Sequence, residues 1–202
     1  MSVWSPVVFA RSARAEGRRL SLTEWATLPE DEPGELVDSV LTEEEMIDPV
    51  HGLCASWLIA LLRAWLGGRG FVFDADMKLA VRKDRGRKAD ACVYLPGRPP
   101  PPRRGLLRTP PDVVVEIVTP TPRDERRDRV DKMDDYAAFG ITYYWLVDPA
   151  LGSFEIFELK DGRYQRALGA TCGVIAHVPG CEGLVIDLDA LWDELERLGP
   201  ED

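Results

Sequence analysis

The sequence lacks the features that mark metal-thiolate, secreted or membrane proteins. Its cysteines have no CxxC spacing, so we predict reduced thiols rather than a zinc site or a disulfide framework. Charged side chains interrupt the first twenty residues, so no signal peptide is expected. The longest apolar run, Leu53 to Leu66, is too short to span a bilayer and contains Arg63. These absences predict a cytoplasmic protein with no membrane partner. The cysteines are Cys54, Cys92, Cys172 and Cys181.

The sequence also lacks an excess of positive charge, an internal repeat and a linker between domains. A formal net charge of -10 argues against a protein that coats nucleic acid through bulk electrostatics. A local basic surface is still compatible with that total, because the segment 82–108 is rich in Lys and Arg. The length of 202 residues predicts one domain over 1–202, with 1–19 loosely ordered and a core at about 50–148.

Hydrophobic periodicity and turn residues predict an α/β fold with the order α-β-β-β-α-β, followed by extra antiparallel strands. A short helix (Leu20–Trp25) and a hairpin (Gly34–Met46) precede this core. The predicted core consists of a helix (Gly52–Leu66), strands (Phe71–Val81, Ala89–Leu95, Asp112–Val118), a helix (Arg123–Phe139) and a strand (Thr142–Val147). After it we expect a hairpin (Phe154–Leu159 and Tyr164–Leu168), two strands (Val174–Val178 and Leu184–Leu188) and a helix (Leu191–Leu198).

One carboxylate interrupts the apolar strand Asp112–Val118. Its nearly continuous apolar run is typical of a strand covered on both faces. Glu116 lies inside this run, and a carboxylate among valines costs several kcal/mol unless a positive group meets it. Glu116 is therefore the strongest functional lead in the sequence.

Strand geometry limits which residue can share a ligand with Glu116. Asp112 lies on the same face of the strand but roughly 13 Å away, which is too far to share one metal. Asp90, which opens the neighbouring strand, is the natural partner. Two converging carboxylates suit Mg²⁺ or Mn²⁺. The alternative is that Asp90 and Glu116 form salt bridges with arginines of the charged turn Arg82–Lys88, and spacing alone does not decide between the two.

Lys132 lies on the helix that follows Glu116. On a helical wheel Val130, Met133, Tyr136 and Ala137 form the arc predicted to be buried, and Lys132 lies at its shoulder. From there its amine could reach the end of the strand that carries Glu116. The alternative is a solvated lysine paired with Asp128 at i,i+4.

Several motifs together resemble the Uma-type restriction endonuclease family of the PD-(D/E)XK nuclease superfamily, also called DUF820. They are Asp90 on a strand, Val115-Glu116-Ile117-Val118-Thr119-Pro120-Thr121, Asp128-Arg129-x-x-Lys132-x-x-x-Tyr136, Gly140-Ile141 and Tyr144-Trp145-Leu146-Val147-Asp148-Pro149. Gly34-Glu35-Leu36-Val37-Asp38 and His51 before the apolar helix are similar to that family too. Two positions differ: Lys88-Ala89-Asp90 lacks the proline of the motif, and Asp38-Ser39 replaces Asp-Gly.

The resemblance, which covers roughly Leu20 to Asp189, implies a restriction-endonuclease-like fold and a set of site residues. Asp90 and Glu116 would bind Mg²⁺ or Mn²⁺, with the carbonyl of Ile117 as a further ligand. Glu35 would be an accessory acid. Lys132 would be the catalytic lysine, moved onto the helix, because Val118 occupies its usual strand position.

The implied activity is metal-assisted hydrolysis of DNA phosphodiester bonds, leaving a 5′-phosphate, and Arg82–Lys88 would either contact the DNA backbone or form a solvated loop. The alternative is a nuclease-fold protein without robust catalysis that acts as a binding or dimerisation module. A homodimer would give a small acidic nuclease reach and symmetry.

The two histidines and the aromatic cluster are assigned structural roles from the sequence. His51 is expected at a helix start or in packing rather than as a base, and a metal-free hydrolase built on it is remote because no nucleophile motif accompanies it. His177 is expected to be structural in a strand. Tyr143, Tyr144 and Trp145 are expected in the core rather than as a base-stacking platform.

Overall fold

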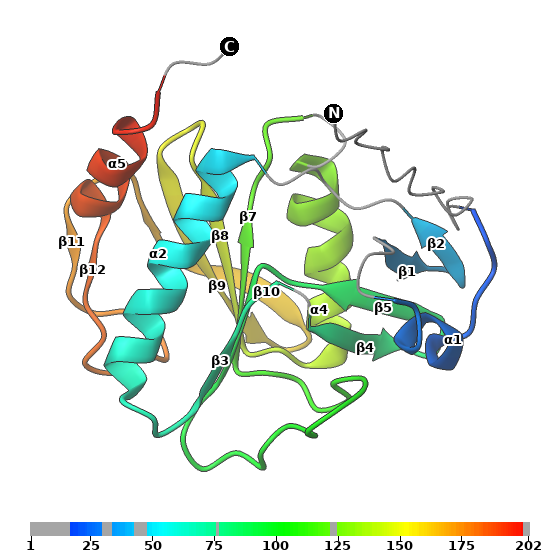
Figure 1. Ribbon diagram of the computed structural model, residues 1–202. Helices are drawn as coiled ribbons and strands as arrows, with labels where there is room; N and C mark the ends of the chain where they lie inside the picture. Colours follow the sequence, from blue (N-terminus) through cyan, green and yellow to red (C-terminus); the bar gives the residue numbers. More distant parts are fainter. Residues whose placement is uncertain (1–16, 30–33, 43–47, 76, 122–124, 200–202) are drawn as a thin grey trace, which may run out of the picture.

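The computed structural model describes residues 17–29, 34–42, 48–75, 77–121 and 125–199. Its largest element is a six-stranded sheet with the strand order β10-β9-β8-β7-β6-β3 (Figure 1). β7 and β8 are parallel and the other neighbours are antiparallel, so the sheet is mixed, as predicted. The strands are β3 (Phe71–Phe73), β6 (Ala91–Tyr94), β7 (Val113–Ile117), β8 (Tyr143–Asp148), β9 (Ser153–Lys160) and β10 (Arg163–Ala170).

Helices cover both faces of this sheet. The apolar helix α2 (Pro49–Leu66) lies on one face, and a π-helical segment, η1 (Arg127–Lys132), continues into α4 (Met133–Phe139) on the other (Figure 1). Successive side chains of a strand point to opposite faces. Val113, Val115 and Ile117 accordingly share a core cluster with α2, whereas Val114 and Val118 share one with Tyr136 of α4. Glu116 must therefore point toward the η1–α4 helix.

The order α-β-β-β-α-β is confirmed by α2, β3, β6, β7, the η1–α4 helix and β8. The single strand predicted at Phe71–Val81 is wrong, because this segment forms two strands in different sheets: β3 and β4 (Lys78–Arg82). The polar residue Asp74 separates the apolar run of β3 from that of β4. The predicted helix start at Arg123 lies outside the described residues.

The charged segment Arg82–Lys88, predicted as a turn, is mostly strand. β5 (Arg85–Lys88) pairs with β4 on one side and with β1 (Glu35–Val37) on the other, and β1 pairs with β2 (Val40–Thr42). We call this four-stranded sheet, of order β2-β1-β5-β4, the arm. Its first hairpin confirms the described part of the predicted one, and residues 43–46 lie outside the described residues. The loop residues Asp38 and Ser39 both have positive φ, so the turn forms without the family's glycine.

A short helix anchors the outer face of the arm. Ser21 caps α1 (Leu22–Ala26) and forms a reciprocal capping box with Glu24. Trp25 of α1 is fully buried, packs in the cluster of Leu36 and Leu41, and covers Gly86. The loose order predicted for 1–19 falls largely on residues 1–16, which lie outside the described residues.

The C-terminal third contains the predicted hairpin and a second, smaller layer. β9 and β10 meet at Asp161-Gly162, where both residues have positive φ, as a two-residue hairpin requires. The strand predicted at Leu184–Leu188 is shorter, because Asp187 caps a helix that begins at once: β12 (Ile186–Asp187) is followed by α5 (Leu188–Glu196). β12 pairs with β11 (Val174–Ile175), and His177 lies exposed beyond that short strand.

The cysteines and the apolar helix α2 can be compared with the sequence-based expectations. All four cysteines are free, as predicted. By length and composition α2 is the one described helix that could cross a membrane. Its Cys54, Leu58, Leu62 and Leu66 instead lie in the core cluster against β6, β7 and β8. The helix is therefore explained as the core helix of the sheet.

The contact between Trp25 and Gly86 yields a stability prediction. A Cβ atom at position 86 would overlap the indole ring of Trp25, so we expect Gly86→Ala to lower the free energy of unfolding by about 1–3 kcal/mol. Gly199→Ala is the matched control, because a Cβ there meets nothing within 4 Å. Urea unfolding measures both. Equal midpoints for Gly86→Ala and the parent would contradict this packing.

Candidate active site between the sheet and the arm

Glu116 lies on the buried face of β7 that points toward the η1–α4 helix. One carboxylate oxygen, Oε2, accepts a hydrogen bond from the Lys132 amine at 2.7 Å. The other, Oε1, accepts one from the Tyr136 hydroxyl at 2.5 Å. The Glu116 residue is 1 % exposed, and burial holds the pKa of its carboxyl well above the usual range despite the Lys132 charge. The predicted approach of Lys132 to Glu116 is therefore present.

Lys132 is a buried ammonium surrounded by acids. Besides Glu116, its amine lies 3.4 Å from Asp128 and 3.8 Å from Glu35. Burial alone would lower the pKa of Lys132, but the negative charges of Glu116, Glu35, Asp128 and Asp90 raise it above its ordinary value. The predicted alternative, a solvated lysine paired with Asp128, is wrong in one respect, because that pair exists inside the protein rather than in solvent.

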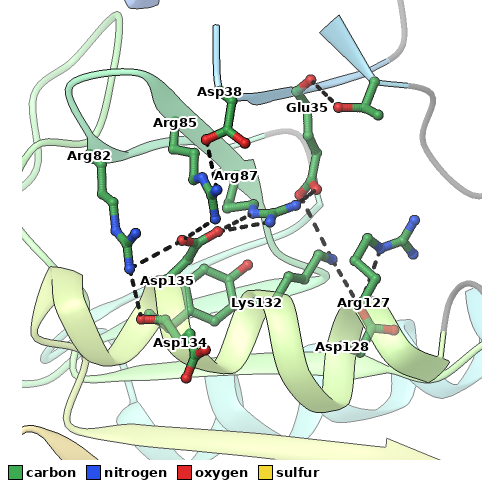
Figure 2. A network of polar contacts seen from close by, with 12 residues as sticks. Glu35, Asp38, Arg82, Arg85, Arg87, Arg127, Asp128, Lys132, Asp134 and Asp135 are labelled. Atoms are coloured by element: carbon green, nitrogen blue, oxygen red, sulfur yellow. Dashed lines mark hydrogen bonds and ion pairs between the residues drawn. The ribbon is translucent and has the colours of Figure 1, made fainter. Parts of the chain in front are cut away.

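Glu35 is held on the opposite side of Lys132 by the arm. Its carboxylate accepts hydrogen bonds from Arg87 at 2.6 Å and from the backbone N–H of Lys88 at 2.9 Å. Burial opposes its ionisation, but the charges of Lys132 and Arg87 and these hydrogen bonds together lower its pKa. Glu35, taken as an accessory acid from the resemblance, thus faces Lys132 across the gap between arm and helix (Figure 2).

A second buried acid, Asp135, fastens the arm to α4. Asp135 is fully buried and pairs with Arg85 and Arg87, both at 2.8 Å, and with Arg82 at 3.6 Å (Figure 2). Arg85 also reaches Asp38, at 2.8 Å. Arg87 thus bridges Glu35 of the arm and Asp135 of the helix and fixes their separation.

These pairs correct two readings of the basic segment. Arg87 is only 2 % exposed, so it cannot contact a DNA backbone, and the segment is not a solvated loop. The salt bridges suggested between these arginines and Asp90 or Glu116 are also wrong, because Arg82, Arg85 and Arg87 pair with other described carboxylates, those of Glu35, Asp38 and Asp135. The arginines instead compensate the buried carboxylates of Glu35 and Asp135 and the exposed one of Asp38.

Asp90 lies across from Glu116 on the neighbouring strand. β6 and β7 pair Ala91 with Val115, which brings the adjacent positions 90 and 116 opposite each other. Asp90 Oδ2 accepts a hydrogen bond from the Ile117 backbone N–H at 2.7 Å and lies 3.2 Å from Nε2 of His51. Burial opposes protonation of His51, but Asp90 stabilises the imidazolium and the pKa of His51 is raised.

The helical face that borders the site differs from the predicted arc. Asp128, Lys132, Asp135 and Tyr136 are buried, whereas Val130 is half exposed. The wheel prediction assumed 100° per residue, but 127–132 forms a π-helical turn, which contains more residues per turn. This buried face can carry charge because its neighbours carry the opposite charge. Lys132 faces Glu116 of β7, and Asp135 faces Arg85 and Arg87 of the arm.

Other residues considered from sequence lie away from this site. Asp112 accepts hydrogen bonds from the Leu95 N–H and from Arg98, which confirms a structural role at the start of the strand. Tyr144 and Trp145 are fully buried, as expected of core residues. The sequence predicted that Tyr136 is buried and offered Asp128 as a surface partner of Lys132, but it assigned neither residue to the site. Asp135 was not considered. Asp128, Lys132 and Tyr136 are spaced four residues apart, which was the available signal that they share one face of the helix.

The donor chemistry fits a hard divalent cation bound partly by water. Among the described residues no three His, Cys, Asp or Glu side chains converge closely enough to hold an ion as they stand. Mg²⁺ commonly takes only one or two carboxylates and completes its shell with water. Asp90 and Glu116 are of that kind. Burial is the main cause of the raised pKa of Glu116, and the negative charges of Asp90 and Asp128 raise it further, an effect that a bound cation would oppose.

The raised pKa of Glu116 predicts how the stability of the metal-free protein depends on pH. Because its folded pKa exceeds the unfolded value of about 4.3, the folded state binds the proton more tightly, and this contribution to stability grows as pH falls through the folded pKa. Glu116→Gln should therefore stabilise the metal-free protein at pH 8 by about 1 kcal/mol, and the gain should shrink toward pH 5.

Lys132→Met should do the opposite, since it leaves several buried acids without their shared ammonium, and we expect a loss of about 3–5 kcal/mol. Urea unfolding in EDTA at several pH values measures both variants, with the exposed Glu196→Gln as control. An equal loss of stability in Glu116→Gln and Lys132→Met would contradict the assignment of excess negative charge.

Comparison with known proteins identifies the family and the fold of this chain. Residues 21–188 match the Uma2 family, described as "Putative restriction endonuclease". The fold is similar to that of a protein from Anabaena variabilis ATCC 29413, described as "a putative nuclease belonging to DUF820", with a TM-score of 0.68 at 17 % identity over 87 % of this chain and 99 % of that chain. None of the curated proteins compared with the chain matches it. Because the family match spans most of the sequence, the chain belongs to the Uma2 family of restriction-endonuclease-like nucleases.

Proposed function

We propose that this protein is a divalent-metal-dependent DNA endonuclease. The observation that carries the proposal is a cluster of acids around one buried ammonium: the carboxylates of Glu35, Asp90, Glu116 and Asp128 all act on Lys132. Arg87 lies beside Glu35 and Arg127 beside Asp128, so the excess of negative charge falls on Asp90 and Glu116. Such an excess adds nothing to stability, because burying carboxylate charge is costly. A site that receives a divalent cation accounts for the excess.

The residues divide into ligands and a charged donor. Asp90 and Glu116 would hold Mg²⁺ or Mn²⁺, with the Ile117 carbonyl as a further ligand implied by the family resemblance. When bound, such an ion lowers the pKa of a coordinated water and polarises the phosphate. Lys132 would donate hydrogen bonds to the attacking water or to the phosphate oxygen that gains charge. Glu35, fixed by Arg87, keeps the Lys132 amine near Glu116.

DNA is the proposed substrate, and its cleavage would leave a 5′-phosphate. With a net charge of -10, attraction to DNA has to be local. Arg82 and Lys83 are exposed at the turn between β4 and β5. We assign contact with the DNA backbone to this turn, because the buried Arg87 cannot reach DNA.

A nuclease-fold binding module without robust catalysis is the second candidate. One observation favours it: both oxygens of Glu116 already have partners, Lys132 and Tyr136, so the carboxylate is satisfied without a metal.

We further propose that 1–202 acts as one domain, in the cytoplasm, and that two copies pair. Sedimentation or light scattering of the full chain tests the pairing.

Cleavage of supercoiled plasmid tests the nuclease. With Mg²⁺ or Mn²⁺ the parent should nick or linearise the plasmid, and EDTA should stop it. Glu116→Ala and Lys132→Ala should each reduce the rate by about 10²-fold or more, since one removes a ligand and the other a donor to the developing charge.

Asp112→Asn is the matched control, because it removes a charge at the start of the same strand but outside the site. Its amide oxygen can still accept the hydrogen bond from the Leu95 N–H, and only the contact with the more exposed Arg98 is lost. Its rate should stay within a few-fold of the parent. No cleavage by the parent with either metal, or undiminished cleavage by both alanine variants, would reject the nuclease and leave the binding module.

A further inference from the structure

His51 is a buried imidazole for which the proposed chemistry has no role so far. It occupies the first turn of α2, where its backbone N–H donates to the Asp48 side chain at 2.7 Å. This cap fixes the start of the helix, so the ring projects from a rigid position. His51 is 5 % exposed, although an apolar residue could fill a buried position at lower cost. Its polarity therefore needs an explanation.

The explanation lies in how the Asp90 carboxylate is held. Two donors, the Ile117 backbone N–H at 2.7 Å and His51 Nε2 at 3.2 Å, meet the same oxygen, Oδ2. The other oxygen, Oδ1, has no hydrogen bond or ion pair with any described residue, and the Asp90 side chain remains 16 % exposed. One oxygen is thus clamped and the other is left for a ligand.

The ring of His51 is committed to this one contact. A carboxylate oxygen only accepts hydrogen bonds, so Nε2 carries a proton and the neutral ring has its lone pair on Nδ1. Nδ1 is buried and has no partner within the part of the chain that the structure describes. Among the described residues, the ring of His51 therefore makes its polar contact with Asp90 alone.

We propose that His51 is a positioning residue, which holds Asp90 in the orientation that binds the divalent cation. The proposal rests on the proposed nuclease function. Ligating carboxylates depend on the donors behind them, and loss of such a donor typically weakens metal binding by about 10–100-fold. His51 would do for Asp90 what Tyr136, at 2.5 Å from Oε1, does for Glu116.

Mn²⁺ binding to the full chain, measured by calorimetry and by electron paramagnetic resonance, tests the proposal. His51→Leu removes the donor but keeps an apolar side chain of similar size, and should weaken Mn²⁺ binding by about 10–100-fold. His51→Gln places an amide N–H near the position of Nε2 and should restore binding to within a few-fold of the parent. His177→Leu is the control, because His177 is the other histidine and is exposed.

Three results would overturn the positioning role: parent-like Mn²⁺ affinity in His51→Leu; equal weakening in His51→Leu and His51→Gln, which indicates packing alone; or imidazole nitrogen coupling in the pulsed spectrum of parent-bound Mn²⁺, which makes His51 a ligand. If His51→Leu does not fold, His51→Asn replaces it, since its shorter amide stays polar but falls short of Asp90. Absence of Mn²⁺ binding by the parent would count against the nuclease proposal itself, and so is distinct from these results.

Discussion

The contact between Glu116 and Lys132 determines where the other parts of the site must lie. A carboxylate inside a valine-rich strand requires a positive partner, because leaving it unpaired costs several kcal/mol. The alternation of side chains along β7 turns Glu116 away from α2 and toward the next helix. The helix must then present an amine at that height, and Lys132, at the end of the π-helical segment, does so at 2.7 Å.

The arm supplies further positive charge for the buried acids, because one lysine cannot compensate all of them. Lys132 is shared among several acids, so Glu35 also has a closer partner of its own in Arg87, and Arg87 in turn pairs with Asp135. This chain of charges runs from the arm to α4 and back, and each member is buried (Figure 2). Buried ion pairs of this kind add little net stability, but breaking one is costly, so they fix geometry. The arm is thereby held at a defined distance from Glu116.

Sequence reasoning found the parts of this site that depend on local pattern. An apolar strand with one acid, a helix with a lysine at its shoulder and a loop with Asp-Gly all leave periodic or turn signals, and β7, Lys132 and the β9–β10 hairpin were predicted from them. The pairs between Glu35 and Arg87 and between Arg87 and Asp135 join residues about fifty positions apart and leave no such signal. The exposure of Val130 was missed because a π-helical turn breaks the assumed 100° period. The approach of His51 to Asp90 depends on how α2 docks on the sheet, which composition does not encode.

The net charge of the chain and the charge of the site are both negative, so both oppose the approach of a phosphate. An acidic surface repels DNA at long range, and screening at physiological salt limits that repulsion to roughly 8 Å. A site with more buried carboxylates than cations repels a phosphate even more strongly at contact, unless positive charge enters with the substrate or before it. Under the proposed function, the divalent cation changes this site from one that excludes phosphate into one that accepts it. Metal binding would then control substrate binding as well as the chemical step, and the Glu116–Lys132 pair would keep the metal-free site folded.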